Sequence, residues 1–447
     1  MKAKTFSLKY AGPLTGAFLV TILAMEATVA AGLPLSNVVR EALSSNPDVA
    51  EARNRWLARR EEVRQAEGGL LPSIDLNAGI GYEYTDSPTT RAADGDTNEM
   101  DRKELGLNLR QMLFDGGGTR SEIARQQART NSAAARLMSV GEATAMEATE
   151  AFINLYRFES LRAITAENLR IHRRIEDQIR LRSEAGVGRR ADHDQVRSRV
   201  ALAEVNLVAA TVNLQDARTT FQRVVGTLPV TIPEPIEIPE RTIPVSLQEI
   251  LAIAEAKNPV LQIAAADIEA ARAQHEAARQ NDYPRFDLEV GGNLNDDIAG
   301  VAGHVDDFSA MVRMRYNLYR GGADAARKRE TKHNINEAKD IRGRSLRQLE
   351  ESVRLAWAAL EATSAQLPLL LRQVESARAT RNAYEKQFNI GQRTLLDLLN
   401  SENEVLQARQ SVVDVRADRQ LAQYRLLEAM GALVDHLGVA DTLALQP

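Results

Sequence analysis

The chain has no cysteine in its 447 residues, and phenylalanine, tryptophan and tyrosine together make up only 4% of it. Without cysteine it can form neither disulfide bonds nor a thiol-linked lipid anchor, which suits an oxidising compartment. The scarcity of aromatic residues and the Ala/Arg/Glu/Gln-rich composition favour long helices over large compact cores. The formal net charge of -5 provides no basic field, so we expect no nucleic-acid partner.

Recognisable catalytic and metal-binding motifs are also missing. The six histidines are scattered and show no paired ligand spacing, and we find no nucleophile motif, phosphate-binding loop or acid/base pair. Asp94-x-Asp96-x-Asn98 has the opening spacing of a calcium loop, but Glu99 replaces the turn glycine and Leu105 replaces the bidentate glutamate. We therefore expect a protein that is not an enzyme and that holds no metal and no cofactor.

Long apolar runs are absent except near the N-terminus. Lysines precede the apolar stretch Ala11–Met25, and the small residues Thr28–Ala31 follow it, which predicts a secretory signal peptide over residues 1–31. The apolar stretch is short and interrupted by glycine and proline, so a retained anchor helix is the less favoured alternative. No other segment reaches the roughly 20 apolar residues that a membrane helix needs. Any membrane attachment must therefore come from something other than a helix or a lipid.

What the sequence does contain is a duplication. Asn-Pro, then Ala-rich sequence, then Pro-x-(Ile/Phe)-Asp-Leu occurs at 46–76 and again at 258–288, a constant offset of 212. Further along, QMLFDGG at 111–117 corresponds to YNLYRGG at 316–322. These matches predict one structural unit used twice. The expected organisation is a first repeat at 32–226, a Pro-rich strap at 227–245, a second repeat at 246–434 and a C-terminal tail at 435–447.

Each unit contains two stretches in which apolar and polar residues alternate, as in strands with one apolar face. They predict a β-hairpin at 73–114 and another at 285–319, hence four strands per chain. Strands of about ten residues with this pattern are typical of outer-membrane barrels; a sandwich sheet with one solvated face is the alternative. Four strands cannot close a barrel, and lipid does not tolerate an open sheet edge. Two chains would give a barrel filled by side chains, whereas three give twelve strands with room for water. We therefore expect a homotrimer.

Helical sequence fills most of the remainder. Residues 119–184 contain no proline and, at about 1.5 Å per residue, would form a helix of roughly 98 Å. Residues 323–387 repeat this length, with a kink expected at Pro368. The helices that return from these, and those before the strands, are expected to be about half as long and to stack end to end beside the long ones. The expected helical hairpins, 119–226 and 322–431, predict a tube of helices; a soluble coiled-coil scaffold is the alternative.

Several short motifs carry a family resemblance. They are the two Asn-Pro helices, LLPSIDL at 70–76, LFDGG at 113–117, and the turn Phe-x-x-Gly-x-Arg-Thr-x-x-Asp-x-Leu-Asn at 388–400. In combination they resemble the TolC family of outer-membrane export ducts, over essentially the whole chain after the signal peptide. The resemblance implies an α+β membrane protein whose homotrimer forms a 12-stranded outer-membrane β-barrel that continues into a long periplasmic α-helical barrel of coiled coils. The internal two-fold repeat would then give six similar sectors around one axis.

The resemblance also implies a gate at the periplasmic tip, where the helical hairpins turn. Arg393 and Asp397 look like the family's tip arginine and acidic constriction residue, and Asp194 looks like the carboxylate that ties neighbouring coils together. Phe388 stands where a tyrosine hydroxyl can help the lock, and Asn400 where a second acidic ring can occur. Both departures imply a weaker lock and weaker cation selectivity. The turns expected to dock an adaptor contain Gly186, Gly188, Arg190, Gly391 and Thr394.

Local helix capping is an alternative role for the same turns. Thr394 with Asp397, and Asp192 with Gln195, have the spacing of capping boxes that begin the returning helices. Three copies of Asp397 around an axis would instead repel one another and attract cations in a narrow opening. The two roles are compatible.

The function that the resemblance implies is the exit duct of a tripartite export machine. The chain has no nucleotide site, so an inner-membrane pump, ABC-type or proton-driven, would supply the energy through a periplasmic adaptor. The long Asp/Arg/Thr-rich first hairpin loop and the missing lipid-accepting cysteine favour type I protein secretion. A drug or metal efflux pump is the alternative, and a soluble periplasmic scaffold ranks below it. The expected location is the outer membrane of a Gram-negative bacterium, in contact with its lipid.

Overall fold

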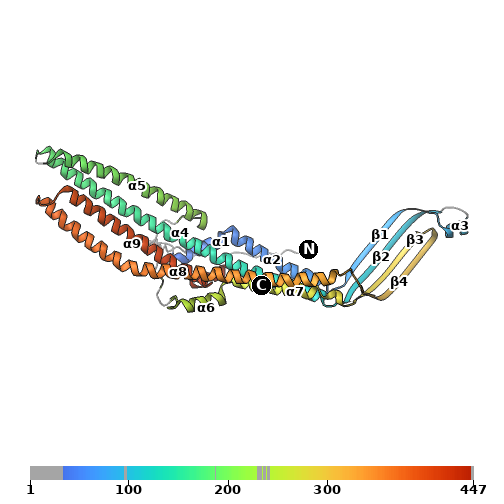
Figure 1. Cartoon of the computed structure of the whole chain (residues 1–447). Coiled ribbons are helices and arrows are strands. Elements are labelled where there is room, and N and C mark those ends of the chain that lie inside the picture. The colour runs from blue at the N-terminus through green and yellow to red at the C-terminus, as the bar shows by residue number, and fades with distance from the viewer. Residues whose placement is uncertain are drawn as a thin grey trace, which may run out of the picture.

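The computed structural model of the chain describes residues 34–94, 98–186, 188–228 and 242–443, together with Glu234 and Ile238. The expected signal peptide lies outside the described residues, as do most of the Pro-rich strap and part of the calcium-like loop. The molecule is elongated, with a β-sheet at one end and the turns of two helical hairpins at the other (Figure 1).

Each half of the chain runs through two short helices, a β-hairpin and a long helical hairpin. The first half consists of α1 (Leu35–Ser45), α2 (Pro47–Gly68), β1 (Ser73–Thr85), α3 (Pro88–Asp94), β2 (Asn98–Phe114), α4 (Gly118–Glu184) and α5 (Arg190–Val225). The second half consists of α6 (Leu247–Lys257), α7 (Pro259–Ala277), the 3-10 turn η2 (Gln280–Asp282), β3 (Arg285–Ile298), β4 (Val301–Arg315), α8 (Ala323–Asn389) and α9 (Leu395–Ala429). The chain then ends in α10 (Leu433–His436) and the 3-10 turn η3 (Ala440–Leu443).

The four strands form one antiparallel sheet in the order β1-β2-β3-β4. Its register places Leu76 beside Leu107, Leu107 beside Gly292, and Gly292 beside Phe308. Because side chains alternate between faces along a strand, this register gathers the apolar residues of all four strands on one face of the sheet. The predicted set of four strands with one apolar face is confirmed. Within the described chain, β1 and β4 are the two edges of the sheet.

Two local features differ from the expectation. Strand β4 ends at Arg315, before the expected end of the hairpin at 319. The reason is a turn, in which the Tyr319 N–H donates to Asn317 Oδ1 at 3.1 Å. The loop between β1 and β2 contains the short helix α3, which the strand pattern did not predict.

Four helices side by side form the wall of the rod. In the half toward the turns the order is α5, α4, α9, α8, and in the half toward the sheet it is α2, α4, α7, α8 (Figure 1). Helices α5 and α9 have 36 and 35 residues against 67 in α4 and α8, as expected. Helices α2 and α7 have only 22 and 19 residues, nearer one third than the expected half. They are shorter because extended backbone at Asn46 and Asn258 separates them from α1 and α6.

The ends of α9 and α7 meet head to tail through Asn258. Its Oδ1 accepts the Val260 N–H at 2.9 Å and so caps α7, while its Nδ2 donates to Ala429 O at the end of α9, also at 2.9 Å. Asn46 caps α2 in the same way, accepting the Asp48 N–H at 2.7 Å. The aligned helix dipoles favour this arrangement, which agrees with the predicted end-to-end stacking.

The largest apolar core lies where the two halves of the rod meet. It contains Leu43 from α1, Phe152 from α4, Phe221 from α5 and Leu433 from α10, all of them buried. The end of the chain is therefore part of the core, where α10 and η3 pack against α4.

Glu142 of α4 is a buried acid within this core. Its carboxylate accepts the N–H groups of Leu433 at 3.1 Å and Val434 at 3.3 Å, the first two residues of α10. Burial disfavours the charged form and outweighs these bonds, raising the pKa of Glu142 to about 7.

Candidate functional site

The candidate functional site is the end of the rod opposite the sheet, where the two helical hairpins turn (Figure 1). In the second hairpin, α8 ends at Asn389 and α9 begins at Leu395. Gly391 between them has φ +79, a left-handed conformation that other residues rarely adopt. Its N–H donates to Phe388 O at 3.0 Å. This tight turn therefore depends on glycine.

Thr394 and Asp397 fix the start of α9. The Thr394 hydroxyl accepts the Asp397 N–H at 3.2 Å, and Asp397 Oδ2 accepts the Thr394 N–H at 3.3 Å and its hydroxyl at 2.9 Å. The predicted capping box is confirmed. One oxygen of the Asp397 carboxylate is thus occupied within its own turn.

Arg393 is held by its own hairpin. Its Nε donates to Gln387 Oε1 at 3.0 Å, its Cζ lies 4.3 Å from the centre of the Tyr384 ring, and its Nη1 is 3.9 Å from Asp397 Oδ2. An exposed cation over an aromatic ring contributes about 0.5–1 kcal/mol. Within one chain, the tip arginine is therefore positioned by α8 and α9 alone.

The first hairpin turns between the end of α4 at Glu184 and the start of α5 at Arg190. Gly186 has φ +74, and the Gly188 N–H donates to Arg182 O at 3.0 Å. A Cβ on Gly188 would lie 3.0 Å from the Ser183 nitrogen, so the chain approaches itself closely here.

The predicted capping box of Asp192 with Gln195 is wrong. Helix α5 begins at Arg190, and its N-cap residue is Arg189, which makes no side-chain capping bond. Asp192 consequently lies inside the first helical turn and cannot occupy the N-cap position. Its carboxylate is still favourable there, because it faces the positive end of the helix dipole.

An apolar cluster joins the two hairpins at the tip. Phe388 of α8 is only 8% exposed and packs among residues of the other three helices, and the Cζ of Arg182 lies 5.1 Å from the centre of its ring. Phe388 was predicted to belong to the gate, but the cluster around it was not predicted. The spacing of Ile175 and Ile179, one helical turn apart, is the signal that could have found it. The cluster consists of Ile175, Ile179, Val196, Phe388, Leu395, Leu398 and Leu399.

The two remaining gate candidates, Asn400 and Asp194, have different surroundings in the structure. Asn400 connects the hairpins, because its Oδ1 accepts Arg199 Nη2 of α5 at 3.4 Å. Asp194 is exposed and makes no hydrogen bond or ion pair with the described part of the chain. The structure therefore brings Asn400 to the contact between hairpins and leaves the side chain of Asp194 exposed to solvent.

Further from the turns, ion pairs also connect the hairpins. Arg157 of α4 pairs with Asp414 of α9 at 2.7 Å. Within the second hairpin, buried Glu402 of α9 lies 3.4 Å from Arg381 of α8. Burial raises the pKa of the Glu402 carboxyl. Neither ion pair was predicted, since pairing between helices cannot be read from residue spacing within one helix.

The tip can hold helices together and present charged side chains to a partner or a passing solute. In the part of the chain that the structure describes, no three His, Asp or Glu side chains gather as a metal site. Among the same residues, no helix is long and apolar enough to span a membrane.

Comparison with known proteins identifies the family. The model of the outer membrane efflux protein family matches residues 38–227 and 250–432. The outer membrane efflux protein BepC of Brucella suis is 26% identical over 416 residues, covering 92% of this chain and 87% of BepC. Outer membrane protein TolC of Escherichia coli is 24% identical, covering 92% and 84%. The alkaline protease secretion protein AprF of Pseudomonas aeruginosa is 24% identical, covering 97% and 89%.

Solved structures share the fold. The Campylobacter jejuni CmeC outer membrane channel superimposes with a TM-score of 0.80 at 14% identity, covering 93% of this chain and 90% of CmeC. The outer membrane protein VceC from Vibrio cholerae gives a TM-score of 0.78 at 18% identity, covering 89% and 96%.

Two alternatives from the sequence analysis are wrong. The described strands form a single sheet and no sandwich, and the matched family is one of outer-membrane proteins, which excludes a soluble scaffold. The resemblance to the TolC family and the expected location in the outer membrane of a Gram-negative bacterium are confirmed. The chain belongs to the outer membrane efflux protein family, whose members are efflux and secretion channels rather than enzymes.

Proposed function

We propose that three copies of this chain close into one duct. The observation that carries the proposal is the pair of unfinished sheet edges: within the described chain, β1 and β4 each pair with one neighbour only. The apolar face of the sheet is exposed, as at Leu76 and Phe308, and suits lipid. Because lipid does not tolerate unpaired backbone at a sheet edge, β1 of one copy must meet β4 of another. Twelve strands would leave a lumen for water, whereas eight would be filled by side chains.

The helical wall has corresponding edges. Helix α5 exposes Leu202, Val205 and Val208 on one edge of the wall, and α8 exposes Leu355 and Leu369 on the other. Helix α8 buries few side chains within the chain, although α4, of equal length, buries many. A closed ring in which α8 of one copy packs against α5 and α2 of the next would cover both edges. The two similar halves of each chain, read as an internal repeat, would then supply six equivalent sectors.

The tip turns would form the gate of this duct. Arg393 is already oriented by Tyr384 and Gln387, and exposed Asp194 is available to a neighbouring copy. Three Asp397 carboxylates, each fixed by its capping box, would form an acidic ring that attracts cations. Phe388 would hold the two hairpins together by apolar packing rather than by a hydroxyl.

An adaptor protein would dock on the same turns. The turn glycines hold the backbone of both hairpins in tight conformations, and Arg190 and Thr394 lie at the first helical turn and the N-cap of the returning helices. The docking residues that we propose are Gly186, Gly188, Arg190, Gly391 and Thr394.

The cargo that we favour is protein exported by type I secretion, driven by an inner-membrane pump. The likeness to the secretion protein AprF, over 97% of this chain, supports this assignment. Drug or metal efflux is the second candidate, and the likeness to the efflux protein BepC favours it.

A gene deletion tests the two candidates in one strain. Proteins in the culture medium and tolerance of dyes and detergents would be compared between the parent, the deletion strain and the deletion strain carrying the gene on a plasmid. Loss of one large secreted protein with unchanged tolerance would support secretion. Unchanged secretion with heightened sensitivity would replace it by efflux, and the loss of both would mean one duct shared between two pumps.

A further inference from the structure

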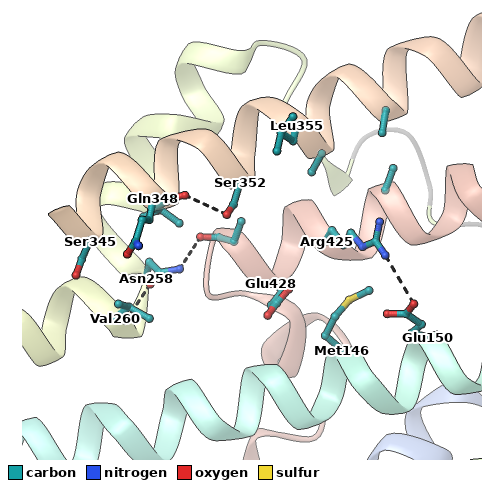
Figure 2. A pocket seen from close by; sticks show the side chains of 15 residues that line it. Met146, Glu150, Asn258, Val260, Ser345, Gln348, Ser352, Leu355, Arg425 and Glu428 are labelled. Atoms are coloured by element: carbon teal, nitrogen blue, oxygen red, sulfur yellow. Dashed lines mark hydrogen bonds and ion pairs between the residues drawn. The ribbon is translucent and has the colours of Figure 1, made fainter. Parts of the chain in front are cut away.

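A cavity of about 640 Å³ lies in the wall of the rod, at the joint where α9 ends and α7 begins. It is lined by residues of α4, α7, α8 and α9 (Figure 2) and lies at this joint rather than at the tip turns. Cavities of about 300–1,000 Å³ are typical of small-molecule sites. None of the residues that line this cavity belongs to the strands or to the tip turns, so neither the sheet nor the proposed gate explains it.

Negative charge is in excess around the cavity, whose lining contains two glutamates and one arginine. Glu150 of α4 pairs with Arg425 of α9 at 3.7 Å. Glu428, one turn further along α9, lines the same cavity but makes no hydrogen bond or ion pair through its carboxylate with the described part of the chain. Arg425 thus serves two carboxylates, of which only Glu150 lies within ion-pair distance. Burial raises the pKa of the Glu428 carboxyl, and the charge of Arg425 opposes this rise only in part.

The other lining residues are apolar or carry hydroxyl or amide groups, the amides being Asn258 and Gln348. Met146 comes from α4, and Leu349, Leu355 and Ala356 come from α8. Ser352 of α8 donates its hydroxyl to Gln348 O at 3.0 Å. A small inorganic cation such as calcium would require about six to eight oxygen ligands. The Glu428 carboxylate, beside the Glu150–Arg425 pair and the apolar side chains of α4 and α8, instead matches an organic cation. The apolar body of such a cation would replace water, and its charge would neutralise the acid.

We propose that this cavity binds an organic cation with an apolar body, and that Glu428 provides the charge that recognises it. All of the residues that carry the proposal belong to a single chain, and the proposal does not depend on what the duct exports. Leu355 also lies on the edge of α8 that the proposed ring would cover, so the next copy would border the cavity.

Equilibrium dialysis of the full-length protein in detergent tests this directly. The probe is tetraphenylphosphonium, and the control ligand is tetraphenylborate, which has the same shape and the opposite charge. Both are also dialysed against detergent alone, so that uptake by micelles is subtracted. We expect saturable binding of tetraphenylphosphonium at one site per chain and no saturable binding of tetraphenylborate.

Three variants separate the site from non-specific uptake. Glu428→Gln should weaken tetraphenylphosphonium binding at least tenfold. Glu404→Gln makes the same charge change at an exposed position of α9 and should leave binding unchanged. Ser352→Trp, at an exposed position of α8 on the cavity rim, should fill the cavity and abolish binding without requiring the core to repack.

Two results would overturn the proposal. One is equal affinity for the phosphonium and the borate, which would show that the cavity binds apolar groups without recognising their charge. The other is wild-type affinity in Ser352→Trp, which would place the probe elsewhere even if Glu428→Gln failed to fold.

Discussion

The side chain of Asn258 joins two helices end to end, and its replacement gives a measurable difference in stability. Asn258 is 7% exposed, caps α7 through Oδ1 and bonds to Ala429 O of α9 through Nδ2. In Asn258→Ala the lost N-cap costs about 1 kcal/mol. The unpaired buried carbonyl of Ala429 costs about 1–3 kcal/mol more. We therefore expect Asn258→Ala to lower the free energy of unfolding by roughly 2–4 kcal/mol.

Asn46 provides the matched control. It caps α2 through Oδ1, but its amide nitrogen has no hydrogen-bond partner among the described residues. Asn46→Ala should therefore cost only about 1 kcal/mol. Aspartate retains the capping acceptor and loses the donor, so Asn46→Asp should be close to neutral, whereas Asn258→Asp should cost about 1–3 kcal/mol.

Guanidinium unfolding in detergent, followed by circular dichroism at the helical minimum, measures these differences. The comparison of the two Asp variants is decisive, because it isolates the bond to Ala429. Equal losses in Asn258→Asp and Asn46→Asp would refute the head-to-tail joint as a source of stability.

Three further predictions concern the core and the tip. Burial raises the pKa of Glu142 in the folded state from its ordinary value of 4.5 to about 7. Its contribution to stability is therefore complete below about pH 4.5 and is lost as the pH rises through 7. Glu142→Gln should reduce the fall in the free energy of unfolding between pH 5 and pH 8 by an amount on the order of 3 kcal/mol, and an unchanged pH profile would contradict this. Arg393→Ala should loosen the tip and raise single-channel conductance in planar bilayers. Arg197→Ala, at an exposed position near the same turns, is the control and should leave the conductance unchanged. Unchanged conductance in Arg393→Ala would count against a gate role. Phe388→Ala should lower the free energy of unfolding by about 3–5 kcal/mol, because it leaves a cavity in the tip cluster, and amide hydrogen exchange at the end of α8 should become faster. Exchange as slow as in the wild type would show that the cluster does not hold the tip together.

The strands and long helices were predictable because their signals are local. Period-two alternation fixed which residues share a face of the sheet, and the proline-free run before Glu184 fixed the length of α4. Helix α3 was missed because it lies in a loop without an apolar period. Helix α10 was not predicted, because four residues are too few to show a helical pattern. Its first residue, Leu433, donates its N–H to the carboxylate of Glu142, which is remote in sequence.

The candidate site was predictable only where its chemistry is local. The Thr394–Asp397 capping box depends on a three-residue spacing and was found. Asp192 has the same kind of spacing, yet α5 starts earlier, so the motif alone was insufficient. The packing of Phe388 against α4 and α5, and the contact of Asn400 with Arg199, depend on the approach of separate hairpins. No pattern within one helix contains that information.

We propose that one chain forms a third of a closed duct. Native mass spectrometry of the full-length protein, released from detergent micelles, tests it most directly. We expect a single dominant species with the mass of three chains, because only a closed ring would pair β1 with β4 and cover the exposed edges of α5 and α8. A dominant single chain or pair of chains under the same conditions would contradict it.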